Sequence, residues 1–383
     1  MNYTSLVNNY TNKYVFGRYV TLKNITPFLE DLNQNFKVED RGKSVEDRSI
    51  KTVTWGVGST RIFMWSQMHG NESTTTKGVL DFLLMLNENT ESFIRDWHSK
   101  FTFLIVPILN PDGAHNYTRV NANQVDLNRD SIDLSQPESR LLRKLFDDFK
   151  PDYAFNLHDQ RTIFGVGDTG KPATLSFLAP SYNEEREINA NRLEAIKLIA
   201  EINKELQEVI PGQVGRFDDG FNMNCIGDYF QSQGVPTILF EAGHYPNDYD
   251  REISRKLVFR SLIVAVYALY QGNYVNNSLD SYLNVPENEK NFNDVSIEYV
   301  KCKETREEYI VKIQYLEQLE KECVKFYPII VDILKKESKF VHHAIKRELF
   351  FKDNLINVSE VINKELTDYV EIDSVMVSEL LKK

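Results

Sequence analysis

Two histidines and a glutamate stand where short apolar segments end. His69 and Glu72 follow the apolar segment 61–66, and His158 follows the apolar segment 153–157. A histidine and a glutamate three residues apart in a turn can bind one cation, although most such pairs are surface pairs without a metal. A lone histidine at a strand end is more often a hydrogen-bonded structural residue. Together, however, two histidines and one carboxylate make the set of three protein ligands that is typical of a catalytic zinc site.

A second carboxylate, Glu241, comes directly after the strand-like residues 237–240. Burying an unpaired carboxylate costs free energy, so we expect this residue to have a purpose. One interpretation is a cap for the helix that follows. The other is a carboxylate beside a zinc-activated water molecule, where it would act as the general base.

The most densely polar segment lies between these residues and runs from 109 to 130. Asn110-Pro-Asp-Gly113 is a turn by its composition. Arg119, Asn128 and Arg129 follow it, either as solvated loop residues or as donors to a substrate carboxylate and a developing oxyanion. Arginine supplies the bidentate fork that a carboxylate needs, which lysine does not.

The elements that must position these residues alternate along residues 40–272. Short apolar strand-like segments are followed by amphipathic helix-like segments, which predicts an α/β/α sandwich around a mixed, largely parallel central sheet. In such sheets, sites form outside the carboxyl ends of the strands. This architecture would therefore bring His69, His158 and Glu241 together.

A polar, turn-rich stretch at 271–278 predicts a domain boundary. We expect a catalytic domain over residues 1–272 and a small α/β region over residues 273–383. Alternation at 309–315 predicts a half-buried strand there, and helices are expected at about 317–336 and 359–382. No function for this region follows from its sequence.

Composition narrows the class of protein. Among 383 residues, 45 Lys and Arg stand against 56 Asp and Glu, and this net charge of −11 argues against nucleic-acid binding. Three irregularly spaced cysteines predict neither a disulfide framework nor a thiolate zinc site, and they fit a reducing compartment. Neither a signal peptide nor a run of about 18 apolar residues is recognisable. We therefore expect a cytoplasmic protein that does not bind membranes.

Six motifs over about residues 40–272 resemble, in their order, the zinc metallocarboxypeptidase family, which has the carboxypeptidase A-like fold. They are His69-Gly-Asn-Glu72, Asn110-Pro-Asp-Gly113, Arg119, Val125-Asp-Leu-Asn-Arg129, His158 and Glu241. The resemblance implies that His69, Glu72 and His158 bind one zinc ion per chain, and that Glu241 is the general base and acid. It also implies that Arg119 polarises the scissile carbonyl, and that Asn128 and Arg129 hold the terminal carboxylate of a peptide.

Two departures from the family's pattern leave the preferred substrate side chain open. Asp130 stands where Asn-Arg-Asn is usual, and residues 217–224 lack the tyrosine that digestive members carry before the general base. The prediction is a zinc carboxypeptidase that acts on a peptide with a free carboxylate. The first alternative is a zinc amidohydrolase of the aspartoacylase and succinylglutamate desuccinylase type, which acts on N-acyl amino acids. The second is an inactive homologue that serves as a binding protein.

Overall fold

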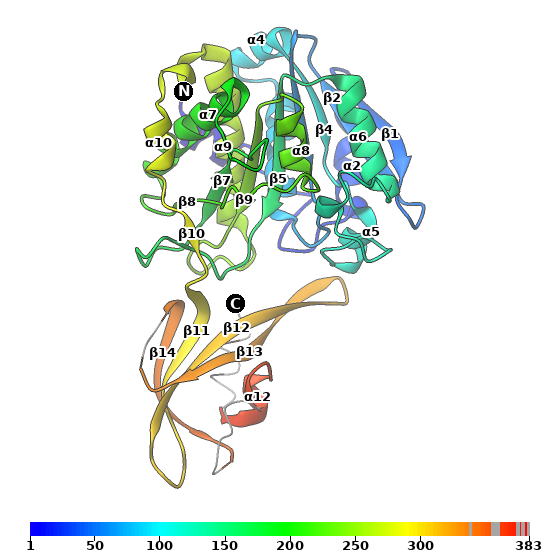
Figure 1. Cartoon of the computed structure of the whole chain (residues 1–383). Helices are drawn as coiled ribbons and strands as arrows, with labels where there is room; N and C mark the ends of the chain where they lie inside the picture. The colour runs from blue at the N-terminus through cyan, green and yellow to red at the C-terminus, as the bar shows by residue number, and fades with distance from the viewer. Residues whose placement is uncertain (337–338, 354–360, 373–375, 377–379, 381–383) are drawn as a thin grey trace.

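The computed structural model describes residues 1–336, 339–353, 361–372, 376 and 380, and these residues form two separate main sheets (Figure 1). The larger sheet has eight strands: β1 (Phe36–Lys43), β2 (Ser49–Trp55), β3 (Thr60–Ser66), β4 (Phe101–Val106), β5 (Tyr153–Asp159), β7 (Leu175–Leu178), β8 (Val214–Arg216) and β9 (Thr237–Ala242). Their order is β1-β2-β4-β3-β5-β9-β7-β8. The central strands β4, β3, β5 and β9 run parallel to one another. Antiparallel pairs join β1 to β2, β2 to β4 and β7 to β9.

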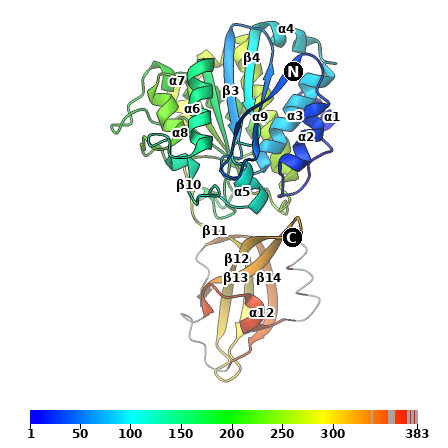
Figure 2. The same ribbon diagram turned by 90° about the vertical axis from the view of Figure 1, so that its right-hand side faces the viewer.

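Helices cover both faces of this sheet (Figure 2). One face carries α1 (Tyr3–Asn9), α2 (Leu22–Glu30), α3 (Thr74–Glu88), α4 (Ser92–Lys100), α7 (Ala190–Gln207) and α9 (Glu252–Gln271), and the other carries α6 (Pro137–Phe149) and α8 (Ile226–Ser232). Successive side chains of a strand point to opposite faces. Ile62 and Met64 of β3 accordingly pack on the α3 and α9 side, and Phe63 and Trp65 pack on the α6 and α8 side. The predicted α/β/α sandwich is confirmed.

The carboxyl ends of three neighbouring strands are level with one another. In the register of β3 with β5, Ser66 lies opposite Leu157, and in that of β5 with β9, His158 lies opposite Glu241. This pairing explains why residues far apart in the sequence meet at one edge of the sheet. Two short helical segments follow the central strands there, α5 (Pro111–Asn116) and η1 (Leu127–Arg129).

The second sheet lies beyond the edge at which those strands end (Figures 1 and 2). Its strands are β11 (Phe292–Lys301), β12 (Glu308–Glu320), β13 (Cys323–Leu334), β14 (Phe340–Phe351) and β15 (Val370–Glu371), in the order β13-β12-β11-β14-β15. The half-buried strand expected at 309–315 is therefore present as part of β12. A short helix, α12 (Leu366–Tyr369), packs against this sheet.

The helix expected at about 317–336 is wrong. Residues 308–334 form an antiparallel hairpin, in which Glu320 lies opposite Cys323 and both turn residues, Lys321 and Glu322, have positive φ. Exposed and half-buried residues alternate over 316–320 and 323–326, and the β-branched residues of 329–331 favour a strand over a helix. The high Glu and Lys content of this stretch was misleading. The helix expected at 359–382 lies partly outside the described residues, and within 361–372 the structure has α12 and β15 instead of one continuous helix.

Residues 273–291 connect the two sheets. They comprise η2 (Asn273–Asn276), α10 (Leu279–Leu283) and β10 (Asn288–Glu289), which pairs with β6 (Gly165–Val166). Tyr274 and Tyr282 belong to the core of the larger sheet, and the second sheet begins only at Phe292. The division of the chain after residue 272 stays a prediction. Among the described residues, none of the helices combines the length and apolar character that crossing a membrane requires.

Candidate metal centre

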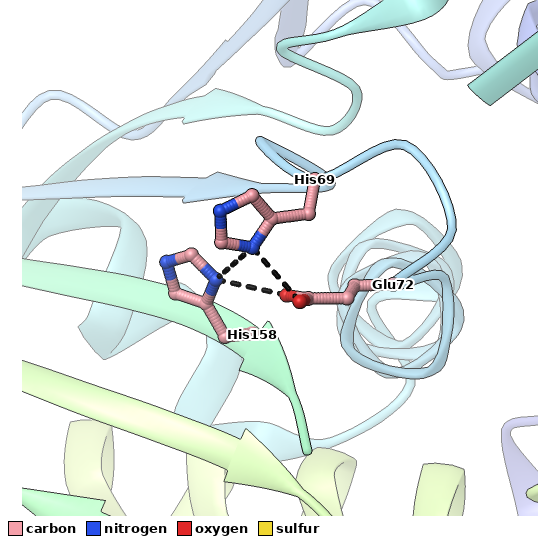
Figure 3. Close-up of side chains that lie close together, drawn as sticks. All are labelled: His69, Glu72 and His158. Carbon is pink, nitrogen blue, oxygen red and sulfur yellow. Dashed lines mark hydrogen bonds and ion pairs between the residues drawn. The ribbon is translucent and has the colours of Figure 1, made fainter. Parts of the chain in front are cut away.

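His69, Glu72 and His158 converge at the ends of β3 and β5 (Figure 3). Nδ1 of His69 lies 2.8 Å from one Glu72 oxygen, Nδ1 of His158 lies 2.9 Å from the other, and the two Nδ1 atoms are 3.1 Å apart. Two nitrogens that bind one tetrahedral zinc ion are about 3.3 Å apart, since each lies about 2.0–2.1 Å from the metal. All three side chains are almost fully buried. This donor set therefore fits a zinc ion.

The loop that carries His69 is shaped by the Asn110-Pro-Asp-Gly113 turn. Asn110 donates from its side chain to the Met68 carbonyl at 3.2 Å and accepts from the Gly113 N–H at 2.8 Å. A Cβ at Gly70 would lie 1.8 Å from the carbonyl carbon of Gly113, so only glycine allows the two backbones to approach so closely. The turn thus holds in place the loop that carries His69.

Asp159, the residue after His158, connects both ligand-bearing segments. Its carboxylate accepts from the backbone N–H groups of Thr74 and Thr75 at 2.7 and 3.1 Å, at the amino terminus of α3. Its own N–H donates to Glu72 at 3.1 Å. A carboxylate at a helix amino terminus is stabilised by the free N–H groups and the helix dipole. Asp159 therefore fixes the position of the start of α3, and that of Glu72 just before it, relative to β5.

Sequence analysis missed Asp126, which lies behind His69. Its carboxylate is 2.9 Å from Nε2 of His69 and 3.1 Å from Nε of Arg119. Although burial opposes it, the hydrogen bond from His69 and the charges of His69 and Arg119 hold the pKa of Asp126 below its usual range. A histidine that binds a metal almost always donates its second N–H to a carboxylate, a backbone carbonyl or water. A search of the sequence for such a carboxylate near the other site residues could have found Asp126. Asp126 stands only two residues before Asn128.

All seven residues singled out in the sequence line one cleft of about 380 Å³. They are His69, Glu72, Arg119, Asn128, Arg129, His158 and Glu241. Arg119 also contacts Glu72 at 3.2 Å, and the exposed Arg129 donates to the Asn128 carbonyl at 2.6 Å and to the Cys225 sulfur at 3.0 Å. Asn128 accepts from the Ile226 N–H at 3.0 Å, which ties the loop of 119–130 to α8.

Glu241 faces this cleft from β9. Its Oε2 is enclosed and has no hydrogen-bond partner among the described residues. Burial, followed by the negative charges of Glu72 and Asp159, raises the pKa of Glu241 well above its usual range. It does not cap the next helix, because Asp248 accepts from the N–H groups of Glu252, Ile253 and Ser254 at the start of α9.

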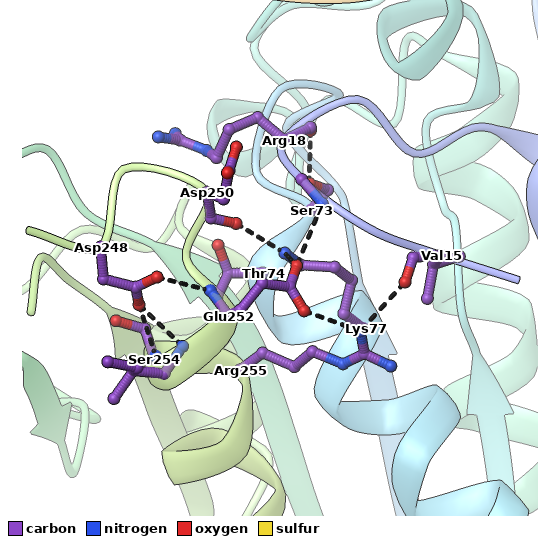
Figure 4. A network of polar contacts seen from close by, with 12 residues as sticks. Val15, Arg18, Ser73, Thr74, Lys77, Asp248, Asp250, Glu252, Ser254 and Arg255 are labelled. Atoms are coloured by element: carbon purple, nitrogen blue, oxygen red, sulfur yellow. Dashed lines mark hydrogen bonds and ion pairs between the residues drawn. The ribbon is translucent and has the colours of Figure 1, made fainter. Parts of the chain in front are cut away.

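Buried charged residues connect α3 with α9 and with the amino-terminal residues (Figure 4). Lys77 on α3 donates to the Asp250 carbonyl at 2.8 Å and to Glu252 at 2.6 Å. Arg255 on α9 pairs with Asp81 on α3 at 2.6 Å, and it donates to the Val15 carbonyl at 3.0 Å. The side chains of Arg255 and Asp81 are both only 1% exposed. Buried charges are tolerated only when paired in this way, so these contacts fix α3, α9 and the amino-terminal residues as one unit.

Comparison with known proteins agrees with these observations. The family model for zinc carboxypeptidase matches residues 25–149. This part of the chain is similar to the zinc carboxypeptidases. Probable carboxypeptidase 2 of Trichophyton verrucosum (strain HKI 0517) is 29% identical over 185 residues, which cover 48% of this chain and 34% of the relative. Carboxypeptidase 2 of Trichophyton equinum is 31% identical over 133 residues, which cover 33% of this chain and 24% of the relative. The match thus spans about a third or less of these relatives' length.

Solved metallo-carboxypeptidase structures share the fold. The enzyme from Burkholderia cenocepacia superposes with a TM-score of 0.52 at 20% identity, covering 66% of this chain and 69% of that one. The enzyme from Pseudomonas aeruginosa, in complex with (2-guanidinoethylmercapto)succinic acid, superposes with a TM-score of 0.52 at 16% identity, covering 65% and 68%. The resemblance predicted from the sequence is confirmed, and the fold is shared with these structures.

The buried pair between Asp81 and Arg255 generates a stability prediction. Asp81→Ala leaves Arg255 without its closest partner in the core, and it also removes the acceptor of the Asn12 N–H at 2.7 Å. We expect the free energy of unfolding, measured by urea denaturation, to fall by about 3 kcal/mol or more. The control is Asp148→Ala, which breaks the exposed pair with Lys144 and is expected to cost less than about 0.5 kcal/mol. Equal costs for the two variants would contradict a structural role for the buried pair.

Asp228 on α8, which also lines the cleft, generates a pH prediction. Burial raises the pKa of Asp228 to about 7, and a hydrogen bond from the Asn222 N–H only partly offsets this. A raised pKa in the folded state favours folding at low pH, and this contribution is lost as the pH rises from about 4 through 7. At pH 8 the free energy of unfolding of Asp228→Asn should therefore be higher than that of wild type. The difference between variant and wild type should be lower at pH 5 than at pH 8 by on the order of 2 kcal/mol. Urea denaturation at both pH values measures it.

The matched control for the pH experiment is Asp168→Asn, at an exposed position outside the cleft. Its effect on the free energy of unfolding should not change between pH 5 and pH 8. If Asp228→Asn also gave the same difference from wild type at both values, Asp228 would not be the buried carboxyl group described here.

Proposed function

We propose that the chain is a zinc-dependent carboxypeptidase, which hydrolyses the last peptide bond of a substrate with a free carboxyl terminus. The observation that carries this proposal is the convergence of two histidine Nδ1 atoms and the Glu72 carboxylate on one point in the cleft. The relation to the zinc carboxypeptidases supports the choice of metal and of reaction. We infer one zinc ion per chain, held by His69, Glu72 and His158.

A zinc ion bound there would lower the pKa of a water molecule towards about 7 and polarise a carbonyl group. Glu241 is the proposed general base: it takes the proton of the attacking water and then passes it to the leaving amine. Burial and the neighbouring negative charges raise its pKa, so its side chain can keep the proton taken from water until the amine leaves. Its enclosed, unpartnered oxygen leaves it without a competing hydrogen bond from the described residues.

Arg119 is proposed to stabilise the oxygen of the scissile carbonyl. Its Nε and Nη1 contact Asp126 and Glu72, which hold the guanidinium in the cleft while its side chain stays 49% exposed. Charge that develops on the carbonyl oxygen during attack is stabilised by such a fixed donor. Asp126 is the proposed positioning residue, since it contacts both Arg119 and the second nitrogen of His69.

Asn128 and Arg129 are proposed to hold the terminal carboxylate of the substrate. The guanidinium of Arg129 is exposed in the cleft and offers the paired donors that a carboxylate binds. The Pseudomonas aeruginosa metallo-carboxypeptidase of similar fold was solved with a succinic acid derivative, which carries carboxylates and so supports this kind of ligand.

Metal content generates the first functional prediction. Elemental analysis of wild type should give about one zinc per chain, and His158→Ala should lose it, because the remaining two ligands do not complete the site. His115→Ala, at an exposed position on α5, is the control and should keep its zinc. Wild type prepared without chelators that holds no zinc would contradict the proposal, and it would favour a binding protein with a carboxypeptidase fold.

Substrate choice generates the second prediction. Wild type should release the last residue from a peptide with a free carboxyl terminus, and kcat/KM should fall at least 100-fold for the same peptide as its carboxyl-terminal amide. Glu241→Gln should keep its zinc and lose about 100- to 10,000-fold in kcat, the range for loss of a general base. The control is Glu184→Gln, at an exposed position outside the cleft, which should keep full activity.

The same assay separates the alternative reactions. Hydrolysis of N-acyl amino acids without hydrolysis of peptides would identify a zinc amidohydrolase instead. Substantial activity in zinc-loaded Glu241→Gln would remove Glu241 from the mechanism.

A further inference from the structure

A second cavity, of about 440 Å³, adjoins the catalytic cleft. Five residues line both spaces: Glu72, Arg119, Asp159, Gln160 and Arg161. The two spaces therefore meet at Glu72, one of the three proposed metal ligands, and at Arg119. The volume of the second cavity lies within the range of about 300–1,000 Å³ that is typical of ligand sites.

The far wall of the second cavity belongs to the appended five-stranded sheet. Residues 314–317 of β12 line it, opposite Asn71 and Arg119 of the larger domain. Glu317 pairs with the buried Arg18 at 3.0 Å and accepts a hydrogen bond from the Tyr117 hydroxyl. Gln314 donates to the Thr162 hydroxyl at 2.5 Å. These buried contacts hold the wall in place against the catalytic domain.

The direction of a bound peptide follows from the proposed function, on which this inference rests. Asn128 and Arg129, the proposed ligands of the terminal carboxylate, line the catalytic cleft and not the second cavity. The scissile bond lies at the metal ligands, between the two spaces. The residues before the scissile bond must therefore extend the other way, towards β12.

The charges around the second cavity favour an acidic group. Arg18 and Arg119 already contact carboxylates, and the buried Arg251 donates to the carbonyls of Ala242 and Gln160 at 2.6 and 2.9 Å. Arg161 differs, because its side chain is exposed and has neither an ion pair nor a hydrogen bond within the part of the chain that the structure describes. It is thus the cation left to pair with a ligand.

Two enclosed acceptors in the lining of the same cavity also lack partners. Oδ1 of Asn71 and Oε1 of Gln314 have no hydrogen bond from any described residue. Such unsatisfied atoms in a native structure mark places where water or a ligand completes the hydrogen bonding. They lie on the two opposite walls, one on the loop between the metal ligands and one on β12.

We propose that the appended sheet forms the wall of the substrate cleft on the acyl side, and that Arg161 there binds an acidic side chain before the scissile bond. The sheet thereby contributes to substrate selection rather than to chemistry. The preferred substrate is a peptide with a carboxylate in the residues preceding the one that is released.

The test compares two blocked peptides that end in the same residue and carry either two Glu or two Gln before the scissile bond. Wild type should cleave the Glu peptide with about 3- to 10-fold higher kcat/KM, the worth of one partly exposed charge pair. Arg161→Gln should abolish this preference, so that kcat/KM for the Glu peptide becomes equal to kcat/KM for the Gln peptide. The matched control, Arg95→Gln, removes an exposed charge on α4, at the end of the molecule away from the second sheet, and should keep the preference.

A second variant tests the wall itself. Leu316 is 46% exposed on β12, so Leu316→Glu is compatible with the fold and places a negative charge in the cavity. We expect kcat/KM to fall further for the Glu peptide than for the Gln peptide. An unchanged ratio would mean that β12 does not face the substrate.

Binding of both peptides to zinc-loaded Glu241→Gln, measured by calorimetry, separates this inference from the proposed function. If wild type cleaves neither peptide, the proposed reaction is wrong, while a tighter Kd for the Glu peptide that depends on Arg161 still supports the acyl-side wall. Equal kcat/KM and equal Kd for the two peptides overturn the inference. So does a preference that survives Arg161→Gln.

Discussion

The candidate site depends above all on the parallel pairing of β3, β5 and β9. Their register brings the end of β3 beside that of β5 and sets His158 opposite Glu241. Because side chains alternate along a strand, a slip of one residue would turn His158 away from the cleft. The register is fixed by packing on both faces, with Phe155 in one core and Ala154 in the other. The same apolar contacts that stabilise the sandwich therefore also aim the polar residues at its edge.

Electrostatics at that edge favour a bound dication. Glu72, Asp159 and Glu241 are carboxylates crowded into a largely buried space. Asp159 is balanced by the amino terminus of α3, and Glu72 by the two histidines and Arg119. The pKa of Glu241 stays raised because burial and the charges of its neighbours both disfavour its ionised form. A metal ion between the histidines and Glu72 would relieve this repulsion and return Glu241 towards the range in which it can act as a base.

The features that could be predicted from the sequence are those with a local pattern of residues. The features that could not be predicted depend on contacts between residues far apart in the chain. His69, Glu72, His158 and Glu241 were recognisable because they stand at or soon after strand-like segments and because the motifs around them follow the order of the zinc metallocarboxypeptidase family. Asp126 and Asp159 were not, because their roles are defined by a histidine nitrogen and a helix end that only the fold brings near them. The sequence predicts a helix over part of the hairpin at 308–334, because its charged residues are good helix formers and only pairing with a partner strand decides otherwise. The cavity wall at 314–317 has no sequence signal at all.

The overall charge of the chain gives a misleading guide to its ligands. A net charge of −11 suggests repulsion of acidic substrates, but charges farther away than about one Debye length, roughly 8 Å at physiological ionic strength, are largely screened. Inside the second cavity the local balance of charge differs. Glu317 is paired with Arg18 and accepts a hydrogen bond from Tyr117, while Arg161 has no ion pair with any residue that the structure describes. The Arg18–Glu317 ion pair also links the amino-terminal residues to the second sheet. Losing either partner would leave the other charge without its counter-charge, which costs free energy. The ion pair with Arg18 thus both holds the second sheet against the larger domain and neutralises the Glu317 carboxylate. With Arg161 left over, the second cavity is locally basic although the protein as a whole is acidic.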